Sequence, residues 1–249
     1  MKMKMISAAF LASMLAACGG GGGGSSNTSP PTSPSAEANG IYQGTDSSND
    51  AIVGVILDTG VYYFVYTNAT SNTVGLVQGT SSSSGGTFKS TDAKNYYIGQ
   101  NTVLNDTVAA TYTVKSNISG TVSPNSGGGA GITFSGTYSP VYDQSPTLTS
   151  IAGTYTGAAG SVKGGESVSL TINADATFTG QGPSGCSFKG VIAAHNGKNV
   201  WDAAVTFGST ACTYPGKTMV GVLAVSNNEI VAAATLPDRS DAFILVGSK

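Results

Sequence analysis

Charged and metal-binding residues are scarce in this sequence. Only 10% of the 249 residues are charged, against about 25% in ordinary globular domains. The net charge is −2 and the 11 basic residues are scattered, so the chain lacks the basic surface that binds nucleic acid. One histidine and three cysteines leave little material for a metal site. We therefore expect no metal, no cofactor and no nucleic-acid partner.

The N-terminus has the parts of an export signal. Lys2 and Lys4 form a basic start, and the next 13 residues, 5–17, are largely apolar. A membrane-spanning helix needs about 20 apolar residues, whereas the apolar core of a signal peptide has about 7–15. The sequence therefore predicts a signal peptide over residues 1–17.

That segment ends in Leu15-Ala16-Ala17-Cys18, which resembles the lipobox of bacterial lipoproteins. The resemblance implies cleavage before Cys18, acylation of its sulfur and amino group, and a membrane anchor made by those acyl chains. Because Gly19 follows rather than aspartate, it implies an outer-membrane location, with the periplasmic or surface face left open. The alternative is an ordinary secretory signal peptide cut at a small-residue site.

A tether follows the lipobox. Residues 19–39 contain Gly, Ser, Thr, Asn, Pro, Ala and one Glu, with no large apolar side chain. Such a segment has nothing to bury, and about 20 flexible residues reach roughly 25 Å. We expect residues 18–39 to connect the lipidated cysteine to the folded part.

The rest of the chain has the pattern of an all-β protein. Short runs of Val, Ile, Thr, Tyr and Phe alternate with Gly, Asn, Asp and Ser, which is typical of strands and turns. A weak repeat is present, because residues 40–44 and residues 153–157 both read Gly-x-Tyr-x-Gly. Pro140 and Pro146 lie in a polar segment between the repeats. We therefore predict two tandem antiparallel modules, residues 40–145 and 146–249.

Each module is predicted to be a small up-and-down barrel of about eight strands, with a two-sheet sandwich as the alternative. Asn196-Gly197 and Asn227-Asn228 suit the tight turns of hairpins. In the first module, residues 81–86 and 126–131 are expected to be loops. In the second module we expect strands near residues 153–157, 167–173, 176–182, 186–193, 199–207, 217–226, 229–236 and 241–247.

The two modules resemble domains of uncharacterised lipoproteins from Gram-negative bacteria. The resemblance runs from Gly-x-Tyr-x-Gly through Gly185-Cys186-Ser187-Phe188-Lys189-Gly190 to Cys212. The modules are also similar to the β-barrel lobes of surface lipoproteins that bind host proteins, and their opening is similar to the Gly-x-Trp of lipocalin-like barrels. This resemblance implies binding and assigns no binding residue.

Two cysteines remain beyond Cys18. In an oxidising envelope, Cys186 and Cys212 are most simply a disulfide. A redox pair would favour a Cys-x-x-Cys spacing, and a metal site would need further ligands nearby. We predict a structural disulfide.

Candidate catalytic groups are few. His195, the only histidine, precedes a hairpin turn and is expected at its exposed tip, without the nucleophile and orienting acid that catalysis needs. Asp58, Asp106 and Asp175 are expected at turns, where Asp bonds its own backbone.

Asp46, Asn49 and Asp50 suggest a calcium site but lack the spacing of a dedicated loop. A solvated turn is the stronger interpretation of these three residues.

Residues 61–66 read Val-Tyr-Tyr-Phe-Val-Tyr, so both faces of a strand there are apolar. The favoured interpretation is barrel interior on one face and packing between the modules on the other. The alternative is a candidate partner surface formed by Tyr62, Phe64 and Tyr66, since aromatic residues are enriched at interfaces.

The sequence thus predicts a lipid-anchored envelope lipoprotein with a binding or surface-interaction role and no catalysis. Alternatives are a carrier of a small apolar ligand or a periplasmic inhibitor of lysozyme or protease, and, more remotely, a hydrolase. A deep apolar cavity of about 300 Å³ or more would favour the carrier.

Overall fold

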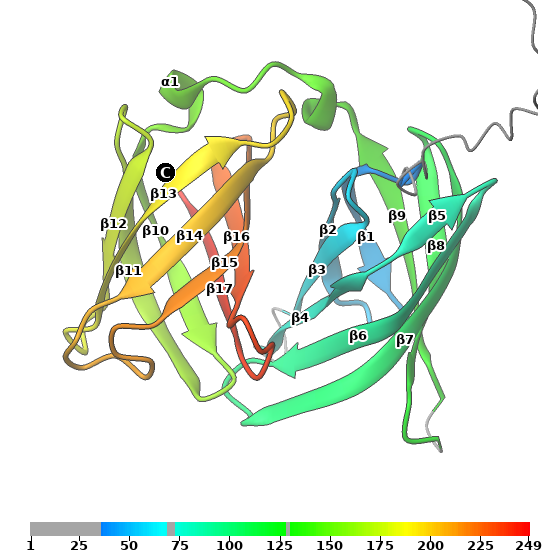
Figure 1. Ribbon diagram of the computed structural model, residues 1–249, viewed down its shortest axis with the longest axis horizontal. Coiled ribbons are helices and arrows are strands. Elements are labelled where there is room, and N and C mark those ends of the chain that lie inside the picture. Colours follow the sequence, from blue (N-terminus) through cyan, green and yellow to red (C-terminus); the bar gives the residue numbers. More distant parts are fainter. Residues whose placement is uncertain (1–35, 69–72, 128–129) are drawn as a thin grey trace, which may run out of the picture. The chain divides into compact units, whose positions relative to one another are not determined.

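The computed structural model describes residues 36–68, 73–127 and 130–249. Their strands form two antiparallel barrels, coloured blue to green and green to red in Figure 1. Both barrels lie within one compact unit, residues 33–249. The predicted all-β class with two barrel-like modules is confirmed, and closure of both sheets excludes the sandwich.

The first barrel closes through a pairing that skips one strand. The strands lie in the order β4-β3-β2-β1-β9-β8-β7-β6-β5 across the sheet. An additional pairing between β4 and β6 closes the sheet into a barrel. The short β5 pairs with β6 beside this ring of eight and lies within the segment expected to be a loop. The strands are β1 (Gly40–Asp46), β2 (Ala51–Ile56), β3 (Val61–Asn68), β4 (Thr73–Thr80), β5 (Ser82–Ser84), β6 (Thr87–Tyr97), β7 (Thr102–Thr113), β8 (Asn117–Pro124) and β9 (Ile132–Ser139).

The second barrel is a plain meander closed by its first and last strands. All eight predicted strands are present within a few residues of the predicted bounds. Asn196, Gly197, Asn227 and Asn228 all have positive φ, as their predicted turns require. The strands are β10 (Gly153–Ser161), β11 (Gly164–Ile172), β12 (Thr177–Gln181), β13 (Ser187–Ala194), β14 (Trp201–Phe207), β15 (Thr218–Ser226), β16 (Glu229–Thr235) and β17 (Ala242–Ser248).

The Gly-x-Tyr-x-Gly repeat has the same structural role in both barrels. The Tyr42 hydroxyl donates to the Ala38 carbonyl at 3.0 Å, and the Tyr155 hydroxyl donates to the Ile151 carbonyl at 2.7 Å. Each bond pins the chain entering a barrel to its first strand.

The last glycine of the repeat allows the first strand to approach the last one closely. A Cβ atom on Gly44 would lie 1.8 Å from the Ser135 carbonyl oxygen, and one on Gly157 would lie 2.1 Å from that of Val246. Backbone at those positions leaves no room for a side chain, so the repeat encodes barrel closure.

The two barrels share an apolar cluster. Tyr63 and Val65, on the outer face of β3, belong to one buried cluster with Val222, Ala233 and Ile244 of the second barrel. Strands β3 and β4 contact β16 and β17. Packing between the modules therefore covers the outer face of β3, as the favoured interpretation of this strand required.

A connector joins the barrels through η1 (Pro140–Asp143) and α1 (Leu148–Ile151). Asp143 accepts hydrogen bonds from Lys115 at 2.7 Å, Lys198 at 2.9 Å and Tyr138 at 2.8 Å. The two lysines hold the pKa of Asp143 well below its usual range. This carboxylate therefore ties the connector to both barrels.

Within the part of the chain that the structure describes, no helix has the length and apolar character needed to cross a membrane.

Candidate ligand-binding site

One end of the first barrel contains a cavity of about 320 Å³, here called the cup. Its mouth lies beside the β1–β2 turn, whose Asp46, Ser48 and Asp50 line it. Its wall is largely apolar and is formed by Ile52, Phe64, Val77, Leu104, Val122, Ile132 and Phe134. A largely apolar pocket with a few polar groups is the usual form of a small-molecule site.

Glycines on neighbouring strands place two of the aromatic rings. Gly54 pairs with Phe64, and a Cβ on Gly54 would lie 2.8 Å from that ring. Gly75 pairs with Tyr66, and its Cβ would lie 2.1 Å from the Tyr66 ring. Because neither glycine has a side chain, each ring packs directly against the glycine opposite it.

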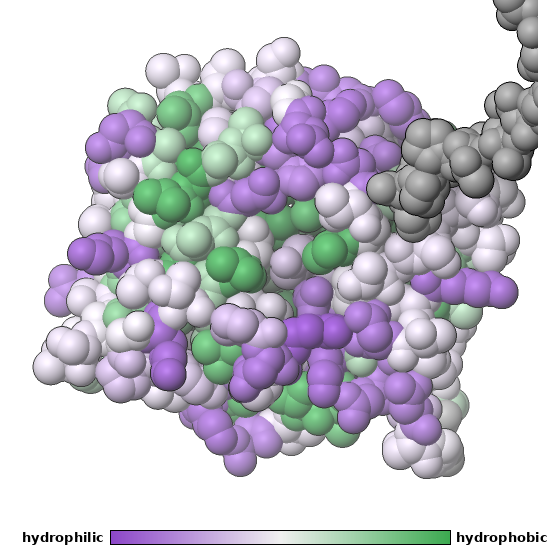
Figure 2. Space-filling view, viewed as in Figure 1, coloured by the Kyte–Doolittle hydropathy of each residue, from purple (hydrophilic) through white to green (hydrophobic). Residues whose placement is uncertain are grey.

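The rim of the cup exposes apolar side chains. Leu104 is 39% exposed and Ile132 is 42% exposed, and both belong to the few large apolar residues at the surface of the described chain. Elsewhere, the face seen in Figure 2 carries apolar residues in separate groups between polar ones. Exposed apolar residues at a cavity mouth are typical of a binding site.

A polar cluster lies in the wall of the cup. The Tyr66 hydroxyl donates to Asn95 Oδ1 at 2.9 Å. Asn95 Nδ2 donates to Asp106 Oδ2 at 3.1 Å and to the Tyr97 hydroxyl at 3.3 Å. All four residues line the cup, so this network directs polar atoms towards a space that is otherwise apolar.

Asp106 is the least satisfied member of the cluster. It is 2% exposed, and its Oδ1 atom is one of four buried side-chain atoms without a hydrogen-bond partner among the described residues. Burial raises the pKa of Asp106, which the hydrogen bond from Asn95 partly counteracts. A buried carboxylate oxygen without a partner costs free energy, so a group that supplies the missing hydrogen bond would be held there.

The sequence placed Asp106 at a turn, and this prediction is wrong. Asp106 lies within β7, where it alternates with outward residues and shares the inner face with Val108, Ala110 and Tyr112. An aspartate among inward apolar positions of a strand was the available signal. Asn95 and Tyr97, also missed, occupy β6 and carried no separate motif.

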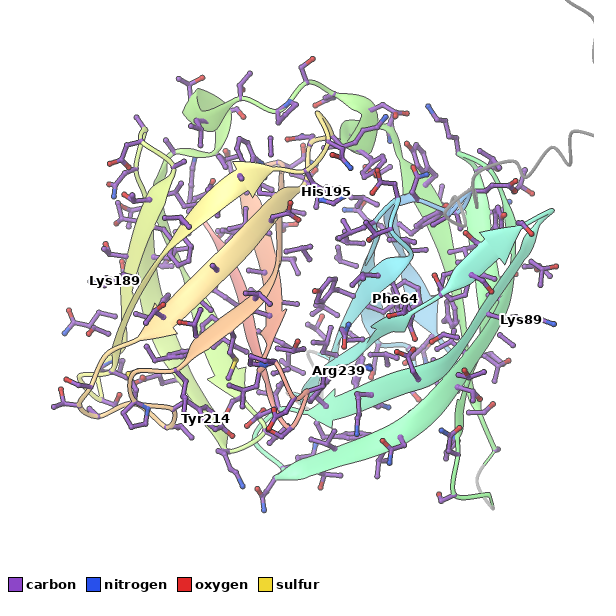
Figure 3. All side chains as sticks on the ribbon, in the orientation of Figure 1. Phe64, Lys89, Lys189, His195, Tyr214 and Arg239 are labelled. Atoms are coloured by element: carbon purple, nitrogen blue, oxygen red, sulfur yellow. A yellow bond between two sulfur atoms is a disulfide. The ribbon has the colours of Figure 1, made fainter. Side chains whose placement is uncertain are left out.

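Tyr62, Phe64 and Tyr66 face the interior of the first barrel and not its outer surface. Tyr62 is fully buried and Phe64 is 5% exposed, and Figure 3 shows Phe64 within the first barrel. The Tyr62 ring contacts Phe64 and Phe88, with centroids 4.9 and 5.4 Å apart. The inner face of β3 therefore builds the core and, through Phe64 and Tyr66, the wall of the cup.

The second barrel has a smaller cavity, of about 250 Å³, at its corresponding end. Phe188, Phe207 and Phe243 pack with centroids 5.2–6.3 Å apart and fill the adjoining interior. Its one lining carboxylate, Glu166, accepts hydrogen bonds from the Ser184 backbone at 2.9 Å and the Ser184 hydroxyl at 2.7 Å. The carboxyl group here is satisfied within the protein.

The disulfide predicted between Cys186 and Cys212 is present, with an S–S distance of 2.00 Å. It joins the β12–β13 turn to the loop between β14 and β15. That loop also contributes Ala211, Thr213 and Tyr214 to the second cavity. The disulfide is therefore a staple across the open end of the second barrel.

His195 is not at an exposed tip, because it is 8% exposed and lies between two carboxylates. Its Nε2 atom is 3.0 Å from Asp58 Oδ1, and its Nδ1 atom is 2.9 Å from Asp202 Oδ1. Burial acts to lower the pKa of His195, but the hydrogen bonds to Asp58 and Asp202 outweigh it and raise that pKa. Asp58 belongs to the first barrel, so this contact is a latch between the barrels.

The remaining candidates are turns. Asp46 Oδ1 accepts from the backbone of Ser48 at 2.8 Å and of Asp50 at 3.0 Å, and Asn49 has a positive φ. Asp175 accepts from the Thr177 backbone at 3.0 Å, which agrees with its predicted turn. Cys18 lies outside the described residues.

The outer face of the second barrel carries a shallow groove of about 560 Å³, lined by Ser, Thr and Gln side chains and by Lys189. Figure 3 shows Lys189 on this outer side. Hydroxyls beside the groove pair with one another, Thr154 with Thr171 at 3.0 Å and Thr206 with Thr218 at 2.8 Å. The groove thus contrasts with the cup, whose wall contains an unsatisfied group.

Comparisons with known proteins give no match: no family model, no curated protein and no solved structure resembles this chain significantly.

Proposed function

We propose that this protein is a lipid-anchored protein of the cell envelope whose first barrel binds a small ligand in the cup. The observation that carries the proposal is the coexistence, in one cavity, of an apolar wall and the cluster of Tyr66, Asn95, Tyr97 and Asp106. An apolar wall provides affinity, and convergent polar groups provide orientation. This favours the carrier role over a surface that binds a protein through Tyr62, Phe64 and Tyr66.

The size of the cup limits the ligand. One water molecule occupies about 30 Å³, so the cup of about 320 Å³ holds about ten non-hydrogen atoms. Ligands of this size bind with dissociation constants of about 1 mM or below when the fit is good.

A panel of ligands that share a phenyl body tests this proposal. Titration calorimetry with 2-phenylethanol, 2-phenylethylamine and phenylacetate would detect binding to the purified protein residues 36–249 or to the full chain in detergent. Saturable binding of at least one member at about 1 mM or below is expected. Binding of none of them would contradict the proposal.

Two matched variants locate the site. Leu104→Trp places a large ring at the rim of the cup, whereas Thr213→Trp places the same ring at the mouth of the second cavity. Both residues lie at cavity mouths, so we expect folding to survive in both variants. Leu104→Trp should abolish binding and Thr213→Trp should leave it unchanged, and the opposite pattern would move the site to the second barrel.

The anchor has its own test. Cys18→Ala removes the sulfur on which the lipobox resemblance depends. Cells supplied with a labelled fatty acid should label the wild-type protein and not the variant. Equal label in both proteins would contradict lipidation at Cys18.

A further inference from the structure

We propose that the cup selects a small organic cation, an ammonium group on an apolar body. This inference rests on the proposed function and adds the charge of the ligand's head group. The unsatisfied carboxylate oxygen of Asp106 in the wall of the cup carries it.

The charges around the cup have one sign. Asp46, Asp50 and Asp106 line it, and no Lys, Arg or His is present among the described lining residues. A cavity with low-dielectric walls and charges of one sign concentrates ligands of the opposite charge. The cup therefore repels an anionic head group and attracts a cationic one.

The geometry at Asp106 adds specificity. Its Oδ2 atom already accepts a hydrogen bond from Asn95 at 3.1 Å, whereas its Oδ1 atom has no partner. An ammonium N–H supplies the missing donor and also compensates the buried negative charge. Hydrogen bonds between charged groups are about twice as strong as neutral ones, so an amine gains more at this position than an alcohol.

Aromatic rings surround the same space. Phe64, Tyr66, Tyr97 and Phe134 all line the cup, and the Tyr66 and Tyr97 rings meet edge to face with centroids 6.4 Å apart. The faces of aromatic rings attract ammonium groups, and aromatic cages are a common means of recognising them. Carboxylate and rings together favour a cation over a neutral molecule of the same shape.

The second barrel provides the contrast. Its cavity also contains a carboxylate, but Glu166 is satisfied by Ser184. No buried side-chain atom of the cavity's described lining residues lacks a hydrogen-bond partner, and Glu166→Gln is a matched control for a change at Asp106.

The experiment compares head groups on the wild-type protein and its variants. Titration calorimetry at neutral pH should rank 2-phenylethylamine first, 2-phenylethanol about 10- to 100-fold weaker, and phenylacetate weakest. Asp106→Asn keeps the shape of the side chain and removes its charge. It should weaken the amine about 10- to 100-fold and leave the alcohol nearly unchanged, while Glu166→Gln should change neither.

The outcomes separate this inference from the proposed function. Equal binding of amine and alcohol by the wild type, or undiminished amine binding by folded Asp106→Asn, overturns the cation selectivity and leaves the cup as a ligand site. Binding of no panel member overturns both. If Asp106→Asn does not fold, the comparison of amine and alcohol on the wild-type protein alone decides whether the cup selects a cation. Benzyltrimethylammonium, which is charged but has no N–H, separates the contribution of charge from that of hydrogen bonding.

Discussion

The two barrels share a strand plan and a repeated entry motif but differ in how their open ends are filled. The second barrel packs Phe188, Phe207 and Phe243 into its interior, and a disulfide staples the loop at its end. The first barrel keeps a cavity there and places a poorly satisfied carboxylate in the cavity wall. A buried carboxylate oxygen without a partner lowers stability. Among the described residues this feature is found in the first barrel and not in the second, which indicates a specialised site in the first barrel.

Phe64 tests whether the inner face of β3 is core. Phe64→Ser should lower the free energy of unfolding by about 3–5 kcal/mol, as large-to-small changes of core aromatics do. Val114→Ser, at a residue that is 55% exposed, is the control and should change stability by about 0.5 kcal/mol or less. Denaturant titration gives both values. A Phe64→Ser protein as stable as the wild type would show that this face of β3 is not part of the core.

The disulfide tests whether the second barrel depends on its staple. The sequence separation is 26 residues, and closing such a loop in the unfolded chain is worth roughly 3.5 kcal/mol. Cys186→Ser with Cys212→Ser should lower stability by about that amount, and a reducing agent should have no further effect on the double variant. Two free thiols in the unfolded, unreduced wild-type protein would show that Cys186 and Cys212 do not form a disulfide.

Asp106 tests whether the first barrel contains a group that lowers its stability. Asp106→Asn removes a buried charge and should raise stability at neutral pH by about 1 kcal/mol or more. Because burial raises the pKa of Asp106 in the folded state, the native protein binds a proton there more readily than the unfolded chain. The stability gain should therefore shrink as the pH falls through that raised pKa. Glu229→Gln, at an exposed position at the start of β16, is the control and should change stability by about 0.5 kcal/mol or less. A loss of stability in Asp106→Asn at neutral pH would show that the carboxylate is already satisfied.

The His195 latch tests the coupling between the barrels and should have the smallest effect. The pKa of His195 is raised in the folded state, so protonated His195 stabilises the protein below its unfolded pKa, and this stabilisation is lost as the pH rises through the folded pKa. Ion pairs with such exposed carboxylates contribute about 0.2–1 kcal/mol. His195→Gln should therefore cost up to about 1 kcal/mol near pH 6 and less at higher pH. If the stability loss of His195→Gln is the same from about pH 6 to about pH 9, the charge on His195 does not contribute to the contact between the barrels.

The sequence predicts the second barrel better than the first for a physical reason. Its strands are joined by short turns, and Asn196-Gly197 and Asn227-Asn228 mark hairpins by local conformation alone. Closure of the first barrel depends on β4 pairing with β6, which no local pattern encodes.

The candidate site was harder still to predict. Phe64 and Tyr66 stood out as aromatic residues on one face of a strand, but the sequence could not say whether that face was interior or exposed. Asp106 looked like a turn residue because Asp often is one. Its contact with Asn95 depends on the register of β6 with β7, and its burial depends on closure of the barrel through β4 and β6.

Amide NMR shifts of the folded protein during titration with 2-phenylethylamine test the central claim most directly. The account predicts saturable shifts concentrated on β3, β6 and β7 around Phe64, Asn95 and Asp106, with the interior of the second barrel unaffected. Shifts centred on Phe188, Phe207 and Phe243, or no saturable shifts at all, would contradict the claim that the first barrel holds the ligand site.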